Sequence, residues 1–199
     1  MDIKFNGNEQ LITSENICNY EESVQKTIKA FKKNCCCFFG HRKINITQPL
    51  IQRLYEVIET LILKSETYIF LFGSNSEFDD LCLKIVTKLQ QDYPHIKKIY
   101  VRASFPYIDN NYRNYLLREY DDTYYPRQII DAGKASYVER NYEMIDNSNV
   151  CVIYYDETYT PTCTKSNRKK ESSYQSKSGT RIAYEYAKRK CIKIKNILE

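Results

Sequence analysis

Short apolar runs alternate with amphipathic segments along most of the chain, and this alternation limits the possible folds more than any single motif does. The apolar runs have the length of buried strands, and the segments between them repeat apolar residues at helical spacing. Strands that alternate with helices form a parallel sheet covered on both faces. With right-handed crossovers, the predicted fold is α/β, a Rossmann-like three-layer sandwich with a mainly parallel five-stranded sheet. The predicted strands are residues 35–39, 67–72, 97–101, 150–155 and 191–197, and the predicted helices are residues 49–64, 78–91 and 179–189.

The chain of 199 residues has the length of one domain, which we place at residues 34–199. Residues 1–33 are predicted to form an N-terminal extension whose short helix, over 21–33, packs on the domain edge. Residues 102–136 are rich in Tyr, Asp, Asn and Arg and are predicted to form an irregular excursion. Residues 156–177 form a polar loop, basic in the middle, which is expected to be either a functional lid or disordered.

Composition excludes several classes of protein. The formal net charge of +5 favours phosphate-bearing ligands and does not require a nucleic-acid partner. The eight cysteines include no C-x-x-C pair and only two histidines are present, so no metal site is predicted. Most of the cysteines lie in apolar runs, as buried thiols do in a reducing compartment. Without a signal peptide or an apolar run of about 20 residues, we expect a cytoplasmic protein with no membrane contact.

Polar clusters occur where the predicted strands end, which is where doubly wound sheets bind their ligands. Gly40 allows close backbone approach, and Arg42 is a bidentate partner for phosphate. Similar clusters follow the second strand, precede the fourth strand and begin the last helix. The candidate ligand-binding residues are Gly40, His41, Arg42, Gly73, Ser74, Phe78, Asp79, Arg140, Asn141, Tyr155, Ser178, Gly179 and Thr180.

Each cluster also has a purely structural interpretation. Ser178-Gly179-Thr180 offers free N–H groups and the positive end of a helix dipole to a phosphate, yet Ser and Thr are ordinary N-caps. The same two alternatives apply to Gly73-Ser74. Asp79 could act as a general base, bond a ribose hydroxyl or complement a helix dipole. His41 could exchange protons or simply bond to backbone. Phe78 or Tyr155 could stack on a base.

Several short motifs follow one another between about residue 35 and residue 197. They are Phe39-Gly40-His41-Arg42, Phe72-Gly73-Ser74, Tyr124-Tyr125-Pro126, Arg140-Asn141 and Ser178-Gly179-Thr180. In this order and spacing, the chain resembles the SLOG superfamily, specifically its small YpsA-like branch. The resemblance implies a Rossmann-like fold with a nucleotide-type ligand at the strand ends. Relatives in the superfamily bind ADP-ribose-derived signals, hydrolyse nucleotides or bind single-stranded DNA.

One departure from related enzymes bears on catalysis. The related lonely-guy phosphoribohydrolases carry a catalytic Glu shortly after their Gly-Thr, whereas here Ala183 lies three positions after Thr180. The nearest carboxylate is Glu185, and a shift of two residues rotates a helical side chain by about 200°. Catalytic residues therefore stay unassigned, and an enzyme is disfavoured.

The expected function is binding of a nucleotide or an NAD/ADP-ribose-derived signalling molecule, as a sensor or a sequestering sponge, with no cofactor. The first alternative is a hydrolase that cleaves an N-glycosidic or phosphate bond, with Asp79, His41 or Glu77 as the acid–base group. The second is single-stranded DNA binding, which the modest net charge disfavours. A homodimer or larger assembly is also expected.

Overall fold

The computed structural model describes residues 14–73, 75–159 and 177–198. It contains a six-stranded sheet in which every neighbouring pair of strands is parallel. The predicted α/β sandwich is thus confirmed, with one strand more than expected. The strands are β1 (Cys35–Gly40), β2 (Ile69–Phe72), β3 (Lys97–Val101), β4 (Asp122–Tyr124), β5 (Val150–Tyr154) and β6 (Lys193–Asn196).

Several helices begin next to a residue whose side chain accepts a hydrogen bond from one of their first N–H groups. The Thr47 hydroxyl accepts a hydrogen bond from the Leu50 amide, while Ser76 and Ser178 cap the helices that follow them. The helices are α1 (Ser14–Ala30), α2 (Gln48–Ser65), α3 (Glu77–Asp92), α4 (Asn110–Leu116), α5 (Ser136–Asp146) and α6 (Gly179–Arg189), with short 3-10 turns at Lys32–Asn34, Arg127–Ile129 and Gly133–Ala135.

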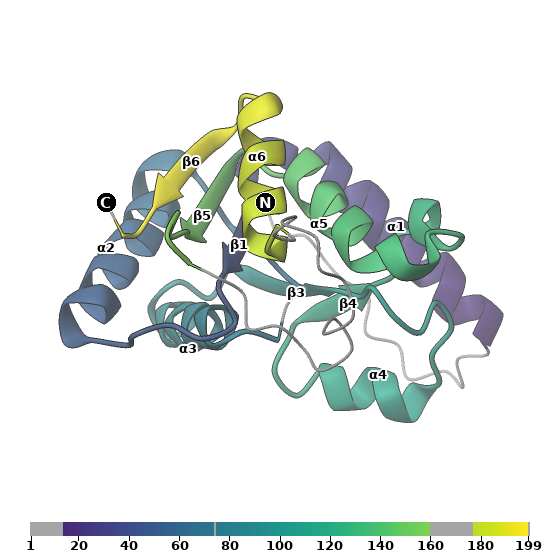
Figure 1. The fold of residues 1–199 in the computed structure, drawn as a ribbon. Helices are drawn as coiled ribbons and strands as arrows, with labels where there is room; N and C mark the ends of the chain where they lie inside the picture. The colour runs from purple at the N-terminus through teal and green to yellow at the C-terminus, as the bar shows by residue number, and fades with distance from the viewer. Residues whose placement is uncertain (1–13, 74, 160–176, 199) are drawn as a thin grey trace, which may run out of the picture.

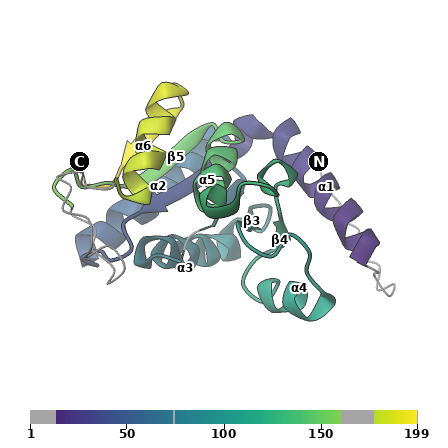
Figure 2. The same ribbon diagram turned by 45° about the vertical axis from the view of Figure 1, so that its right-hand side comes forward.

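The sheet separates two layers of helices. Buried side chains of α2 and α3 pack on one face, and those of α1, α5 and α6 pack on the other. Figures 1 and 2 show α3 across the sheet from α5 and α6. β1 contributes to both layers, because Cys36 and Phe38 join the first cluster while Cys35 and Cys37 join the second. The triple-cysteine run is therefore a central strand that is buried on both faces.

The strand order reverses at one particular point. In the order β4-β3-β2-β1-β5-β6, the chain moves outward from β1 to β4 and then returns to the other side of β1. Gly40 is paired with Tyr154 at this reversal. Ligands of open α/β sheets bind beyond the carboxyl ends of the strands at such a switch point.

The segment 102–136 is more ordered than the sequence predicted. It contains α4 and β4 and is followed directly by α5, a helix that was also not predicted. β4 is only three residues long and begins with Asp122, whose carboxylate accepts a hydrogen bond from Tyr20 at 2.6 Å. Contacts from distant parts of the chain therefore support this strand, and local sequence does not reveal them.

The N-terminal helix α1 lies at the β4 side of the sheet, away from α2 (Figure 2). Its apolar residues Val24 and Ile28 are buried in the second cluster. Within the described ranges, no helix combines the length and the apolar character needed to cross a membrane. Most of the predicted polar loop, residues 160–176, lies outside the described residues.

Candidate functional site

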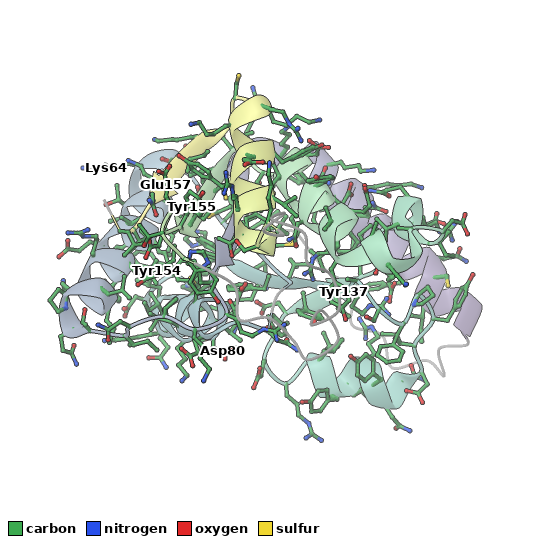
Figure 3. All side chains as sticks on the ribbon, viewed as in Figure 1. Lys64, Asp80, Tyr137, Tyr154, Tyr155 and Glu157 are labelled. Carbon is green, nitrogen blue, oxygen red and sulfur yellow. The ribbon has the colours of Figure 1, made fainter. Side chains whose placement is uncertain are left out.

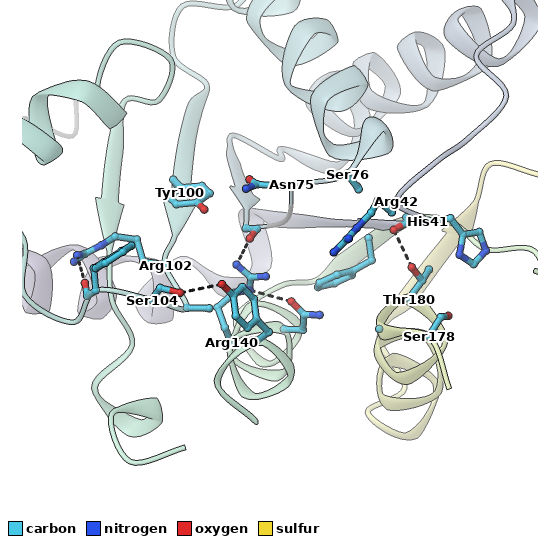
Figure 4. A pocket seen from close by; sticks show the side chains of 18 of the residues that line it. His41, Arg42, Asn75, Ser76, Tyr100, Arg102, Ser104, Arg140, Ser178 and Thr180 are labelled. Carbon is cyan, nitrogen blue, oxygen red and sulfur yellow. Dashed lines mark hydrogen bonds between the residues drawn. The ribbon is translucent and has the colours of Figure 1, made fainter. Parts of the chain in front are cut away.

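A cavity of about 650 Å³ opens beyond the carboxyl ends of β1, β2 and β3, next to the first turn of α6 (Figure 4). From β1 and the loop after it, Gly40, His41 and Arg42 line the cavity. Gly73 lines it from the end of β2. The remaining predicted lining residues are Arg140 and Asn141 from α5, and Ser178, Gly179 and Thr180 from the start of α6.

The start of α6 is capped, is bonded to β1, and lines the cavity. The Ser178 hydroxyl accepts the Arg181 amide at 3.1 Å, which is an ordinary N-cap. The Thr180 hydroxyl donates to the Gly40 carbonyl at 2.8 Å, which fixes the helix against the end of β1. The amides of Gly179 and Thr180 have no acceptor within the described part of the chain. The positive end of the helix is thus available to an anion.

Arg42 is an exposed cation held by its backbone. The Arg42 carbonyl accepts the Glu77 amide at 3.0 Å, and the Glu77 carboxylate accepts the Ile44 amide at 3.0 Å. The side chain extends into the cavity (Figure 4), and its guanidinium bonds to no acceptor among the residues that the structure describes. It can therefore form charge-assisted bonds to a ligand without breaking others.

Arg140 is a buried cation that joins two strand ends. Its Nη1 donates to the carbonyls of Gly73 and Val101, the latter at 3.0 Å, and its Nε donates to Asn141 at 2.9 Å. A side chain at position 73 would overlap the guanidinium, so only glycine allows this approach. Burial lowers the pKa of Arg140, opposed by the nearby Tyr100 and Asp79. The sequence predicted that Arg140 would bind a phosphate. Its Nη1 and Nε instead donate to groups of the protein at the floor of the cavity.

His41 is almost fully buried at the cavity wall. Its Nε2 accepts the Asp156 amide at 3.0 Å, so the neutral ring carries its proton on Nδ1. The ring stacks on Tyr159 with 3.8 Å between the ring centroids. Burial lowers the pKa of His41, with the charge of Asp156 opposing this effect. The geometry fits the backbone-bonded alternative for this residue.

Buried His41 predicts a loss of stability in mild acid. Its ordinary pKa is about 6.5, and burial holds the pKa in the folded protein lower. The stability gained from the neutral ring is therefore complete above about pH 6.5 and is lost as pH falls through the folded-state pKa. Urea unfolding at several pH values measures how the free energy of unfolding depends on pH. His41→Asn should remove the loss of stability that His41 causes in mild acid, whereas His95→Asn, at an exposed position, should keep it.

The two histidine variants must be compared with each other, because other buried groups change the stability in the opposite direction as pH falls. Burial raises the pKa values of Glu21 and Asp122, which favours the folded protein as pH falls. These carboxyl groups are common to both variants. Equal pH slopes in the two variants would contradict the account of His41.

Three other predicted residues lie outside the cavity lining. Phe78 is fully buried beneath Gly40, where a Cβ would overlap its ring. Asp79 is buried and accepts a hydrogen bond from the Ser76 hydroxyl at 2.7 Å. Tyr155 is buried and stacks on Tyr184 at 4.4 Å, and Figure 3 shows it across α6 from Tyr137. Ser74 lies outside the described residues.

The sequence did not identify the opposite side of the cavity. Arg102 and the residues after it extend from β3, α4 contributes Tyr112, and α5 contributes Tyr137. Arg102 is buried, donates to the Phe105 carbonyl at 2.7 Å and pairs with Glu21 of α1. The available signal was the density of aromatic residues in the segment predicted to be irregular.

The charge of the described lining has one sign. It includes the arginines at positions 42, 102 and 140 and no Asp, Glu or Lys. Glu185 pairs instead with Lys177 and Arg181 on the exposed side of α6, and Ala183 is buried in the core. A cavity of this size, with cations, helix amides and aromatic rings, can hold a small anionic ligand. No protein-family model matches the chain, and a search of curated proteins finds no match either.

Proposed function

We propose that the protein binds a nucleotide or an NAD/ADP-ribose-derived molecule in this cavity. The phosphates lie against the amides of Gly179 and Thr180, and Arg42 neutralises their charge. One observation carries the proposal: the described lining combines a helix start and an unpaired arginine with no carboxylate to repel an anion. The sequence resemblance to the SLOG superfamily supports the same class of ligand.

The positions of the nearby carboxylates support binding over hydrolysis. Asp79 is buried under Ser76, Glu77 accepts the Ile44 amide, and Glu185 faces away from the cavity. A general acid or base must reach the bond that is cleaved, directly or through one water. We therefore propose that the protein acts as a sensor or sequesters its ligand.

Titration calorimetry tests the proposal directly. ADP-ribose, its cyclic isomers, NAD and AMP are added in turn to the purified protein, and the ligand is recovered afterwards and checked for turnover. We expect saturable heat for at least one of these molecules and recovery of the intact ligand. Absence of binding to every one of them would overturn the proposal, and conversion of the ligand would favour the hydrolase.

Arg42→Ala is expected to weaken nucleotide binding about tenfold or more, because a hydrogen bond to a charged group contributes about 1.5–3 kcal/mol. The matched control is Lys43→Ala, which removes an adjacent exposed cation that does not line the cavity. Both variants should unfold like the wild type, since neither cation is buried. Equal affinities of the two variants would show that Arg42 does not contact the ligand.

A further inference from the structure

The cavity has an aromatic end that is distinct from its cationic end. Phe105, Tyr112 and Tyr137 all border it, and the side chains of Phe105 and Tyr137 remain 63% and 59% exposed. Phe105 follows β3, while Thr180 bonds to the end of β1, and β2 lies between these two strands. The rings and the α6 amides therefore face the same cavity from opposite sides.

Phe105 combines an exposed ring with an unusual backbone conformation. Its φ of 58° is in the left-handed region, which bulky side chains rarely adopt. The Phe105 carbonyl accepts a bond from Arg102 Nη1 at 2.7 Å, and the other end of that guanidinium pairs with buried Glu21. Among the described aromatic residues, its ring contacts Tyr112 edge-on at 5.7 Å between centroids. Strained backbone that persists because buried groups hold it is often part of a ligand site.

We propose that this aromatic end is the subsite for the base of the nucleotide, with Phe105 as the stacking platform. The inference rests on the function proposed above, because the opposite end must take the phosphates. Aromatic side chains accept any base by stacking, since every base has a π-face. The geometry therefore identifies the class of ligand and leaves the identity of the base open.

The two ends of the cavity lie beyond strands that are not neighbours in the sheet. Neighbouring strands lie about 4.8 Å apart, so the ends of β1 and β3 are about 10 Å apart. A ligand that fills both ends carries its aromatic ring beyond β3 and its phosphate beyond β1. A nucleoside diphosphate reaches further than a monophosphate by one bridging oxygen and one phosphorus. We therefore expect a nucleoside diphosphate to fill both ends better than a mononucleotide.

Calorimetry with ADP, AMP and inorganic pyrophosphate tests this subsite. The wild type should bind ADP more tightly than AMP. Phe105→Leu removes the π-face and keeps an apolar side chain, so ADP affinity should fall about tenfold, while pyrophosphate affinity stays within about twofold. Phe105→Tyr should restore ADP binding. Tyr107→Ala, which removes an aromatic side chain that is 68% exposed and outside this cavity, should leave ADP binding unchanged.

The outcomes separate the two proposals. If ADP binds equally to the wild type and to Phe105→Leu, the base subsite is wrong and the nucleotide-binding proposal stands. If Phe105→Leu weakens pyrophosphate and ADP equally, the residue only shapes the cavity, and the base subsite is again wrong. If the wild type binds none of ADP, AMP and pyrophosphate, the base subsite is wrong, and the nucleotide-binding proposal fails only if ADP-ribose, its cyclic isomers and NAD do not bind either.

Discussion

Glu21→Ala is expected to lower the free energy of unfolding by about 3–5 kcal/mol, because it leaves a buried cation without its partner. The carboxylate of Glu21 pairs with Arg102, and the two side chains are 7% and 1% exposed. Glu21 also accepts the Tyr125 amide at 3.2 Å. Burial raises the pKa of Glu21 and lowers that of Arg102, so removing either partner leaves the other desolvated. Urea unfolding measures the effect.

The adjacent residue gives a matched control. Glu22 pairs with Arg127, and these side chains are 28% and 63% exposed. Glu22→Ala should therefore lower the free energy of unfolding by no more than about 1 kcal/mol. In the double variant Glu21→Ala with Arg102→Met, much of the stability should return, because no buried charge is left unpaired. A Glu21→Ala protein as stable as Glu22→Ala would refute the role given to this ion pair.

Arg140→Ala is expected to damage both stability and ligand binding. It leaves the carbonyls of Gly73 and Val101 without a donor, at a cost of about 1–3 kcal/mol for each buried group. The same defect should follow from Gly73→Ala, whose Cβ would overlap the guanidinium. Thermal unfolding and calorimetry with ADP-ribose measure the two effects.

Gly179→Ala is the control for the stability of these two variants, because a Cβ there meets nothing within 4 Å. It should fold normally. Arg140→Lys keeps the charge but lacks the planar fork, so it should recover only part of the lost stability. If Gly73→Ala proved as stable as Gly179→Ala, the bonds from Arg140 to the strand ends would not stabilise the fold.

The sheet and the helices around it were predictable because their signals are local. The apolar run at Cys35–Gly40 and the helical spacing in Gln48–Ser65 agree with the prediction within two residues. α5 was missed because Arg140 and Glu143 occupy buried positions of that helix. Charged residues at buried positions hide the apolar pattern, and only contacts across the fold explain their burial.

The site was predictable at its cationic end and not at its aromatic end. Parallel strands bring their carboxyl ends to one edge, so Gly40, Gly73 and the start of α6 could be placed together from sequence. The conformation of Phe105 depends on Arg102, which in turn depends on Glu21 in the N-terminal helix. Because Glu21 is far from Arg102 and Phe105 in the sequence, no local sequence pattern reveals this dependence.

Amide NMR spectra recorded during a titration with ADP-ribose show which residues the nucleotide contacts. If it binds at the strand ends, the amide signals of Gly179, Thr180 and Gly73, which border the cavity, should shift until binding is saturated. The signal of Gly133, which lies outside the cavity lining, should remain in place. Absence of any shift, or shifts confined to residues away from this cavity, would contradict nucleotide binding at the strand ends.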